Sequence, residues 1–247
     1  MAKSTGLAQQ FFVHGYDLSG DVSAIDTASS PREVFEVPNL AKSAMERLLG
    51  RSDGNIDFST WFDDGAGLEH AALSGLPTTD IIVLWALGGS VSDASAAMTA
   101  KQINYDGSRG NDGSLAFSVQ TRATGGIPLH WGTMLSAGKI THSSAGSSAS
   151  RDDSASTSAG ARAWLLMTDI DSGTPTVKIQ ESSNDSSWSD LITFSAIANG
   201  NEPTAEYLTM SGTVARYLRI TTTGTFSNAD FAVAIQRGTA QDDEDLS

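Results

Sequence analysis

The spacing of apolar residues predicts a protein built mainly from short β-strands. Residues 56–62 alternate, with Ile56 and Phe58 on one face and Asp57 on the other, which is the period of a half-buried strand. Residues 80–87 are nearly all apolar, a pattern typical of a strand that is buried on both faces. Further strands, each bounded by turn-forming residues, are predicted at 11–18, 33–37, 98–105, 114–122, 129–135, 161–170, 176–180, 191–197, 215–222 and 231–236.

Two segments predict short helices instead. Residues 40–49 place their apolar side chains near one helical face, and Gly50 follows as a plausible stop. Residues 65–75 have the composition of a two-turn helix that ends before Pro77. The expected fold class is therefore mainly β, with short helices.

A change in composition divides the chain. Residues 142–160 are rich in serine and contain no large apolar side chain. Such a segment cannot build a core, so we expect a flexible loop or linker there. This divides the chain into a β-domain at 1–141 and a C-terminal β lobe, resembling a sandwich, at 161–238. The acidic tail at 239–247 carries four consecutive acids and is expected to fray.

The strands at 98–105 and 114–122 predict a β-hairpin with a long connector rich in glycine and aspartate. Strands with little helix to cover them leave unpaired edges, and pairing with other copies is one way to cover such edges. We therefore predict that this hairpin is an assembly arm, through the residues Asp106, Gly107, Ser108, Arg109, Gly110, Asn111, Asp112 and Gly113.

The charge of the chain excludes several kinds of partner. The 247 residues carry a formal net charge of −14, which disfavours sequence-specific nucleic-acid binding. Cysteine is absent, so disulfides and thiolate metal sites are excluded. The N-terminus shows no signal-peptide pattern, and the apolar run at 81–87 is too short to cross a membrane.

No catalytic or metal-binding motif stands out. The histidines His14, His70, His130 and His142 are not spaced as metal ligands. The sequence lacks a P-loop, a Gly-x-Ser-x-Gly elbow and the ligand order of an EF-hand. The acid pairs 63–64 and 152–153 keep a hydrolase open as an alternative, although exposed acids are expected in so acidic a chain. We expect no enzyme and no cofactor.

Trp188 is the one tryptophan in a polar turn, whereas Trp61, Trp85, Trp131 and Trp164 lie in apolar strands. An exposed tryptophan on a β-loop can stack on a sugar ring, but it can equally cover the end of a sandwich. Trp188 is therefore a candidate ligand platform. It keeps a carbohydrate-binding or capsid-decoration module open as an alternative function.

Two stretches resemble proteins of phage particles. The first begins with Gly-Tyr-Asp-Leu-Ser-Gly-Asp at 15–21 and continues through 42–54 to the strand at 58–62, with further likeness at 73–80 and 100–106. It resembles the N-terminal half of major tail proteins of siphophages that infect actinobacteria. The second stretch, 177–188 with 215–220, resembles β-sandwich segments of phage virion proteins and, more loosely, discoidin-like binding modules.

The resemblance implies a tail-tube-like β-sandwich or barrel and a structural role in the virion. Such subunits form stacked rings, usually hexameric, around a channel through which DNA passes without specific binding. The implied partners are further copies of the chain and other tail proteins, such as the tape measure and terminator proteins. Assembly in the host cytoplasm, with no membrane contact, is also implied.

Candidate acids facing such a channel are Asp57, Asp63 and Asp64, because the neighbouring strand alternates apolar and polar positions as a channel wall would. The same acids could instead lie on an outer face, exposed to solvent. The net negative charge of the chain favours a channel to which DNA does not adhere.

Overall fold

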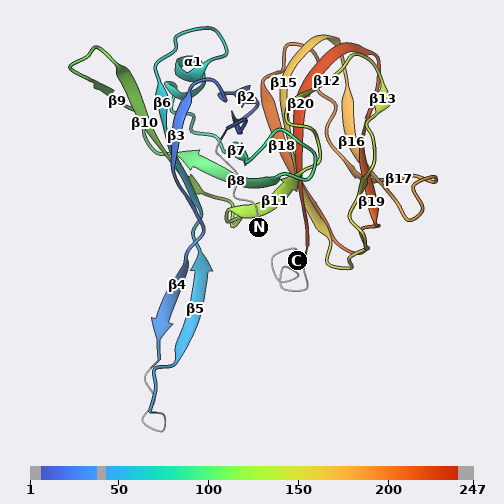
Figure 1. The fold of residues 1–247 in the computed structure, drawn as a ribbon, viewed down its shortest axis with the longest axis horizontal. Helices are drawn as coiled ribbons and strands as arrows, with labels where there is room; N and C mark the ends of the chain where they lie inside the picture. Colours follow the sequence, from blue (N-terminus) through green and yellow to red (C-terminus); the bar gives the residue numbers. More distant parts are fainter. Residues whose placement is uncertain (1–6, 38–42, 239–247) are drawn as a thin grey trace.

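The computed structural model describes residues 7–37 and 43–238, and these form two lobes made almost entirely of antiparallel strands (Figure 1). The mainly β fold class predicted from the sequence is confirmed. The first lobe contains β1 (Gln10–Val13), β2 (Tyr16–Asp17), β3 (Val22–Ser29), β4 (Arg32–Glu36), β5 (Arg47–Ser52), β6 (Asn55–Trp61), α1 (Glu69–Leu73), β7 (Ile81–Ala86), β8 (Ala94–Gln102), β9 (Asp106–Arg109), β10 (Leu115–Ala123) and β11 (His130–Met134).

The second lobe is a β-sandwich that follows directly in sequence. Its strands are β12 (Ile140–His142), β13 (Gly146–Ser147), β14 (Arg151–Asp152), β15 (Ala161–Gly173), β16 (Thr176–Ser182), β17 (Ser189–Thr193), β18 (Thr204–Met210), β19 (Tyr217–Thr223) and β20 (Phe226–Arg237). One layer contains β18, β15, β20 and β12, and the other contains β13, β14, β19, β16 and β17. Side chains such as Leu165, Ile179 and Ile220 fill the space between the layers.

The first lobe is a barrel that does not close. Neighbouring strands pair in the order β1, β7, β8, β10, β6 and β3, and the described residues contain no strand that pairs β3 with β1. Phe11 from β1 and Phe58 from β6 meet across the interior, with ring centroids 4.6 Å apart. The predicted face of β6 is confirmed, because Ile56, Phe58 and Thr60 are all buried.

The two lobes share one sheet. The first half of β8 pairs with β11, β11 pairs with β20, and the last residues of β8 pair with β10 of the barrel. Along β15, Leu165 points into the sandwich while Trp164 and Leu166 point toward the first lobe. There they meet Phe12 and other side chains of the barrel in a core cluster of their own.

The uninterrupted apolar runs follow from this arrangement. In β7, Val83 faces the barrel interior and Leu84 faces the cluster between the lobes. Both faces of β7 and of the middle of β15 are therefore covered, and residues 81–86 and 163–167 are apolar without interruption. The two lobes are thus distinct in their outer parts but are joined by a buried contact, and β12 places the first strand of the second lobe at Ile140.

Residues 142–160 differ from the sequence-based expectation of a flexible loop. β13 and β14 pair with β19, and Thr157 pairs with Val214. The side chain of Arg151 takes the place of an apolar anchor, since this residue is only 6% exposed. It donates to Asp153 at 2.9 Å and to the backbone oxygen of Met134 at 3.3 Å. The serine-rich composition did not predict this ordered segment, because it is held by backbone pairing and one buried arginine and not by large apolar side chains.

The predicted helices are also corrected. Residues 47–49 of the proposed 40–49 helix lie in β5, which pairs with β4, and residues 40–42 fall outside the described part of the chain. Together β4 and β5 form a two-stranded ribbon that leaves the body (Figure 1). We call this ribbon, residues 32–36 with 47–52, the long arm. The predicted 65–75 helix is real but shorter, at α1 (Glu69–Leu73).

Candidate assembly surfaces

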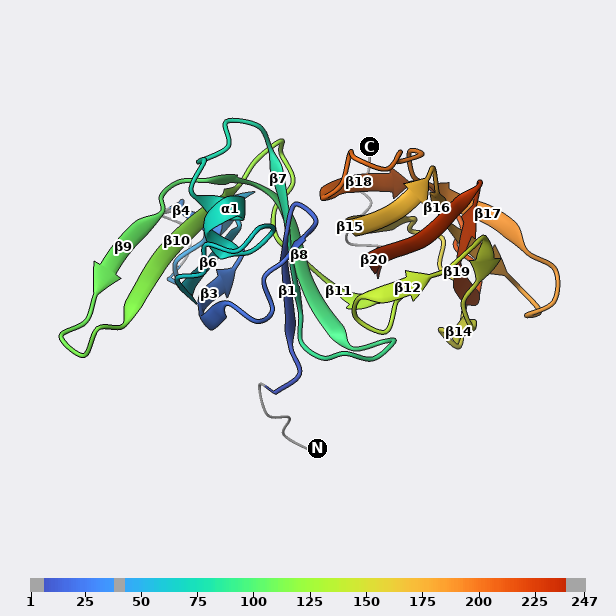
Figure 2. The ribbon, with the colours of Figure 1, turned by 90° about the horizontal axis from the view of Figure 1, so that it is seen from above.

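The predicted assembly hairpin projects from the first lobe, as Figure 2 shows for β9 and β10. The predicted first strand, 98–105, ends at Gln102 in β8, and the first half of the predicted connector is itself a strand, β9, in which Asp106 pairs with Ser118 and Arg109 pairs with Leu115. The connector is therefore strand over its first half, and the turn is confined to 110–113. All four residues of β9 are exposed, so the hairpin is accessible along its length.

A short hydrogen-bonded turn closes the tip of this hairpin. The backbone N–H of Gly110 donates to the backbone oxygen of Ser114 at 2.8 Å. Oδ1 of Asp112 accepts from the backbone N–H of Ser114 at 3.0 Å and from its hydroxyl at 2.7 Å. These bonds lower the pKa of the Asp112 carboxyl. Gly113 has a φ of +94°, which favours glycine. The tip is thus ordered by its own residues.

A buried polar network supports the base of the hairpin. Tyr105 stacks on Phe117 with ring centroids 4.2 Å apart, and its hydroxyl donates to Oε2 of Glu69 at 3.0 Å. Glu69 is fully buried, and its Oε1 accepts from the hydroxyl of Thr60 at 2.7 Å. The Tyr105 hydroxyl also lies 3.0 Å from Nδ1 of His70. Burial, followed by the hydrogen bond to Glu69, raises the pKa of Tyr105.

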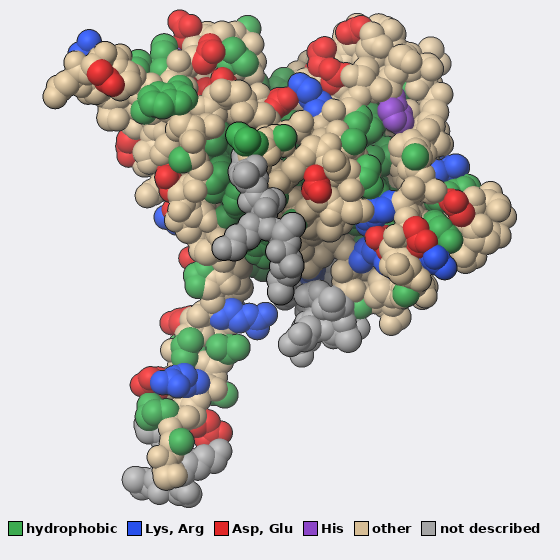
Figure 3. Space-filling model, viewed as in Figure 1, with side chains coloured by type: hydrophobic (Ala, Val, Ile, Leu, Met, Phe, Trp, Pro, Cys, Tyr) green, Lys and Arg blue, Asp and Glu red, His purple; other side chains and the backbone are tan. Residues whose placement is uncertain are grey.

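The long arm exposes an unusual amount of apolar surface. Val34 pairs with Leu49 and Phe35 pairs with Leu48, so each face of the ribbon presents one apolar pair. These four residues are 48–65% exposed. Figure 3 shows the apolar side chains along the arm, below the body of the molecule. Sequence reasoning missed this arm because the same residues also fit a helical period.

The candidate channel acids lie in different surroundings. Asp57 on β6 accepts from Nη1 of Arg122 at 2.6 Å, so its charge is compensated. Oδ1 of Asp63 accepts from the backbone N–H of Gly65 at 2.9 Å, and Asp64 is exposed. Asp63 and Asp64 therefore contribute more to the negative surface than Asp57 does.

The aspartates of the other acidic pair each bind a different arginine. Asp152 accepts from Nε and Nη2 of Arg216 at 2.6 Å, and Asp153 pairs with Arg151 at 2.9 Å. Their charges are thus engaged in separate ion pairs, which gives no arrangement for acid–base catalysis. Within the described residues, no group of three histidine or acidic side chains is arranged to hold a metal ion.

Trp188 does not offer an open ring face on the side where Arg219 lies. The guanidinium carbon of Arg219 is 4.2 Å from the centre of the Trp188 ring. Arg219 is held in place by two hydrogen bonds to Oε1 of Gln180, at 3.0 and 2.8 Å. This cation–π contact occupies the surface on which a sugar would stack. Trp61 and Trp131, expected in a core or an interface, are 53% and 49% exposed.

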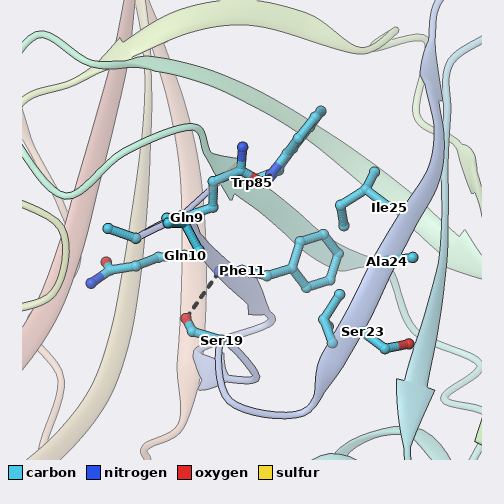
Figure 4. A pocket seen from close by; sticks show the side chains of 11 residues that line it. Gln9, Gln10, Phe11, Ser19, Ser23, Ala24, Ile25 and Trp85 are labelled. Carbon is cyan, nitrogen blue, oxygen red and sulfur yellow. Dashed lines mark hydrogen bonds between the residues drawn. The ribbon is translucent and has the colours of Figure 1, made fainter. Parts of the chain in front are cut away.

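A narrow groove marks the opening of the barrel. It has a volume of about 250 Å³ and lies between β1 and β3, with Trp85 at one side. Figure 4 shows Phe11 and Ile25 on opposite walls. At one end, the Oγ of Ser19 accepts from the backbone N–H of Phe11 at 3.0 Å, which closes the groove there (Figure 4).

No protein-family model matches the chain, and no curated protein matches it. The Dit protein of phage SPP1, described as a paradigm of the hub adsorption apparatus in phages infecting Gram-positive bacteria, is similar at 8% identity and a TM-score of 0.33, over 93% of this chain and 99% of that chain.

Two baseplate structures are similar at the same level. The phage p2 baseplate in its activated conformation with Sr has 6% identity and a TM-score of 0.33, over 94% of this chain and 99% of that chain. The form with Ca has 9% identity and a TM-score of 0.30, with the same coverage. Scores of this size do not establish a common fold. In the described part of the chain, no helix is long and apolar enough to cross a membrane.

Proposed function

We propose that this protein is a non-enzymatic structural component of a phage tail that assembles with copies of itself through its projecting β-ribbons. The observation that carries the proposal is the long arm, whose side chains Val34, Phe35, Leu48 and Leu49 are about half exposed. Covering the exposed half of such a side chain stabilises an assembly by on the order of 1 kcal/mol. An arm of this kind is stabilised by a partner, whereas an isolated two-stranded ribbon is marginally stable in water.

The short hairpin of β9 and β10 supports the same proposal. It projects from another side of the first lobe, and its base is held by the buried carboxylate of Glu69. Two separate projections suit an assembly with two kinds of contact, one that closes a ring and one that stacks rings. The resemblance of residues 15–21 to tail proteins supports placing these rings in a virion tail, whose channel conducts DNA. The resembling segment at 42–54 departs from the implied helix, because β5 lies there.

Electron microscopy of the purified protein in negative stain tests the proposal. Rings or tubes are expected, with the six-fold symmetry that the resemblance implies. Deleting residues 107–112 should leave a folded protein that no longer assembles. A matched control shortens the exposed turn at 183–187 in the second lobe and should assemble normally. A wild-type protein that stays monomeric at all concentrations would refute the proposal.

The carbohydrate-binding alternative has no observation that favours it over assembly, because Arg219 covers one face of the Trp188 ring. A glycan-array signal that disappears in the Trp188→Ala variant would reinstate it. Turnover of a polysaccharide would support the hydrolase alternative.

A further inference from the structure

We propose that a positively charged cleft at the base of the long arm binds the acidic segment at 242–245 of the same chain. The cleft has a volume of about 350 Å³ and lies between the arm and the loop that joins β10 to β11. Arg32 and Arg51 line it from the arm, and residues within 123–128 line it from the loop. The contact lies within one subunit, so this inference does not rest on the proposed assembly.

Most basic side chains in the described part of the chain have partners, and Arg32 and Arg51 have none. Arg122 and Arg216, for example, each bind an aspartate at 2.6 Å. Within the described residues, the basic residues whose side chains make no hydrogen bond, ion pair or ring contact are Arg32, Arg51 and Arg109. Arg109 lies apart on the short hairpin, whereas the other two share one cleft. In a chain with 29 acidic and 15 basic residues, such a pair favours an anionic occupant.

Backbone contacts fix the shape of the cleft. The backbone N–H of Asp53 donates to the backbone oxygen of Pro31 at 2.9 Å, which joins the two sides of the arm at its base. The backbone N–H of Ala123 donates to the backbone oxygen of Gly54 at 2.8 Å. Gly54 also lies so close to the backbone of Leu129 that a side chain would not fit there. The base of the arm is therefore held in a fixed position against the loop that follows β10.

The charge of the lining favours carboxylates. One acid, Asp53, lines the cleft beside the two arginines, which leaves a net charge of +1 there. Glu33, next to Arg32 on β4, does not line it. Both arginines are exposed, so their guanidinium groups can bind carboxylates in a bidentate manner without being buried first. The cleft is therefore suited to an acidic peptide segment.

The acidic segment lies within reach of this cleft along the chain. It has the sequence Asp-Asp-Glu-Asp, the longest run of acids in the chain, and it follows β20, which ends at Arg237. Gly132 of β11 lies against the backbone of Gln236, and Pro128 of the cleft comes four residues before Gly132. At about 3.4 Å per residue, those four residues span at most about 14 Å, whereas the six residues from Gln236 to Asp242 span up to about 20 Å. The chain after β20 is thus long enough to bring the acids to the arginines.

The position of the arginines agrees with this route. Figure 3 shows basic side chains where the long arm leaves the body, on the side of the arm that faces the second lobe. That lobe ends with β20, from which the acidic segment continues. Exposed ion pairs between separate molecules contribute little, but a short connection raises the effective concentration to the order of millimolar. The contact ties the arm of the first lobe to the end of the second lobe.

Carbodiimide crosslinking of the full chain tests the contact. Arg51→Lys keeps the positive charge and provides a primary amine, which forms an amide with an adjacent carboxylate while the carbodiimide takes up water. We expect mass spectrometry to find position 51 joined to an acid at 242–245. Arg109→Lys is the matched control, because Arg109 is also exposed and its side chain has no partner among the described residues. Crosslinks from position 109 to 242–245 should be at least about tenfold less abundant, since the connection concentrates the acids near the cleft and not near the hairpin turn.

A second substitution and a mixing experiment complete the test. Adding Arg32→Gln to the Arg51→Lys variant should reduce the crosslink about threefold, because one of the two cations is lost. Adding Arg47→Gln instead, farther along the arm, should leave the crosslink unchanged. In an equal mixture of isotope-labelled and unlabelled protein, both halves of each crosslinked peptide should come from one chain. Crosslinks only between differently labelled chains, equal yields at positions 51 and 109, or no crosslink at position 51 would overturn the inference.

Discussion

Tyr105 donates its hydroxyl to the buried carboxylate of Glu69 at 3.0 Å, and this bond joins the base of the short hairpin to α1. Removing the donor leaves a buried acceptor with one partner fewer, which costs about 1–3 kcal/mol. We therefore expect Tyr105→Phe to lower the free energy of unfolding by that amount in urea denaturation. Tyr217→Phe is the control, and its effect should stay within about 0.5 kcal/mol. An equal effect of both variants would contradict the role of the bond.

The core cluster between the lobes predicts that both lobes unfold together. Leu84 of β7 and Leu166 of β15 are fully buried in this cluster. Replacing either with alanine should cost about 2–5 kcal/mol. The loss should appear in a single transition, with the same midpoint by tryptophan fluorescence and by circular dichroism. Two transitions, of which only one moves in Leu84→Ala, would show that the lobes are independent domains.

Limited proteolysis distinguishes an ordered segment at 142–160 from a flexible one. Arg151 is 6% exposed and paired with Asp153, so trypsin should spare it in the folded protein. Early cuts are expected at Arg109 next to the hairpin turn and at Arg51 in the long arm, since short ribbons open locally at low cost. Mass spectrometry of the first fragments gives the order. An initial cut after Arg151 would restore the linker interpretation.

Two partly buried histidines predict a loss of stability in mild acid. Burial lowers the pKa of His14 and of His142 below the usual 6.5. The unfolded chain therefore binds protons first, and stability falls as the pH decreases through about 6.5. Urea midpoints should drop between about pH 7.5 and about pH 5.5. The loss should be smaller in His14→Asn, because this variant lacks one of the two titrating groups. Asparagine is chosen because it tolerates the φ of +49° at this position. A pH-independent midpoint over this range would refute this assignment.

The acidic surface predicts that assembled protein does not retain DNA. Asp63 and Asp64 are the candidate channel acids whose charges no arginine compensates among the described residues. A gel shift should show free DNA even at low salt, where cationic contacts would be strongest. Salt-sensitive binding would contradict a non-adhesive channel. A structure of the assembly with both acids on its outer surface would overturn only the assignment of Asp63 and Asp64 to the channel wall.

The sequence was informative where the local pattern and the tertiary environment agree. The alternation around Phe58 and the apolar run around Val83 both predicted the observed burial. The Gly-rich connector also predicted a hairpin, although the pairing of Arg109 with Leu115 shortened its turn. In these segments, the polarity of the side chains along each strand indicates directly which face is buried.

Elsewhere the deciding contacts are distant in sequence. The apolar residues of 40–49 fit a helix, but Leu48 and Leu49 pair with Phe35 and Val34 across the ribbon. Glu36 and Arg47, which lie 3.5 Å apart, were a possible signal of opposed strands. The groove beside Ala24 could not be predicted, because its lining comes from β1, β3 and Trp85 of β7, which are separated in sequence.

The sheet shared by the two lobes has a geometric consequence for any assembly. β20 pairs with β15 over nearly its whole length and also with β11, while residues 146–147 and 151–152 pair with β19. Paired strands and a shared core cluster join the two lobes in the described residues, so we expect them to move as one body. In the proposed assembly, the angle between neighbouring copies would then depend on the fixed positions of the long arm and the short hairpin on one subunit, and not on bending at a hinge. A substitution that tilts β8 against β11 would therefore change the number of copies per turn while leaving every contact surface intact.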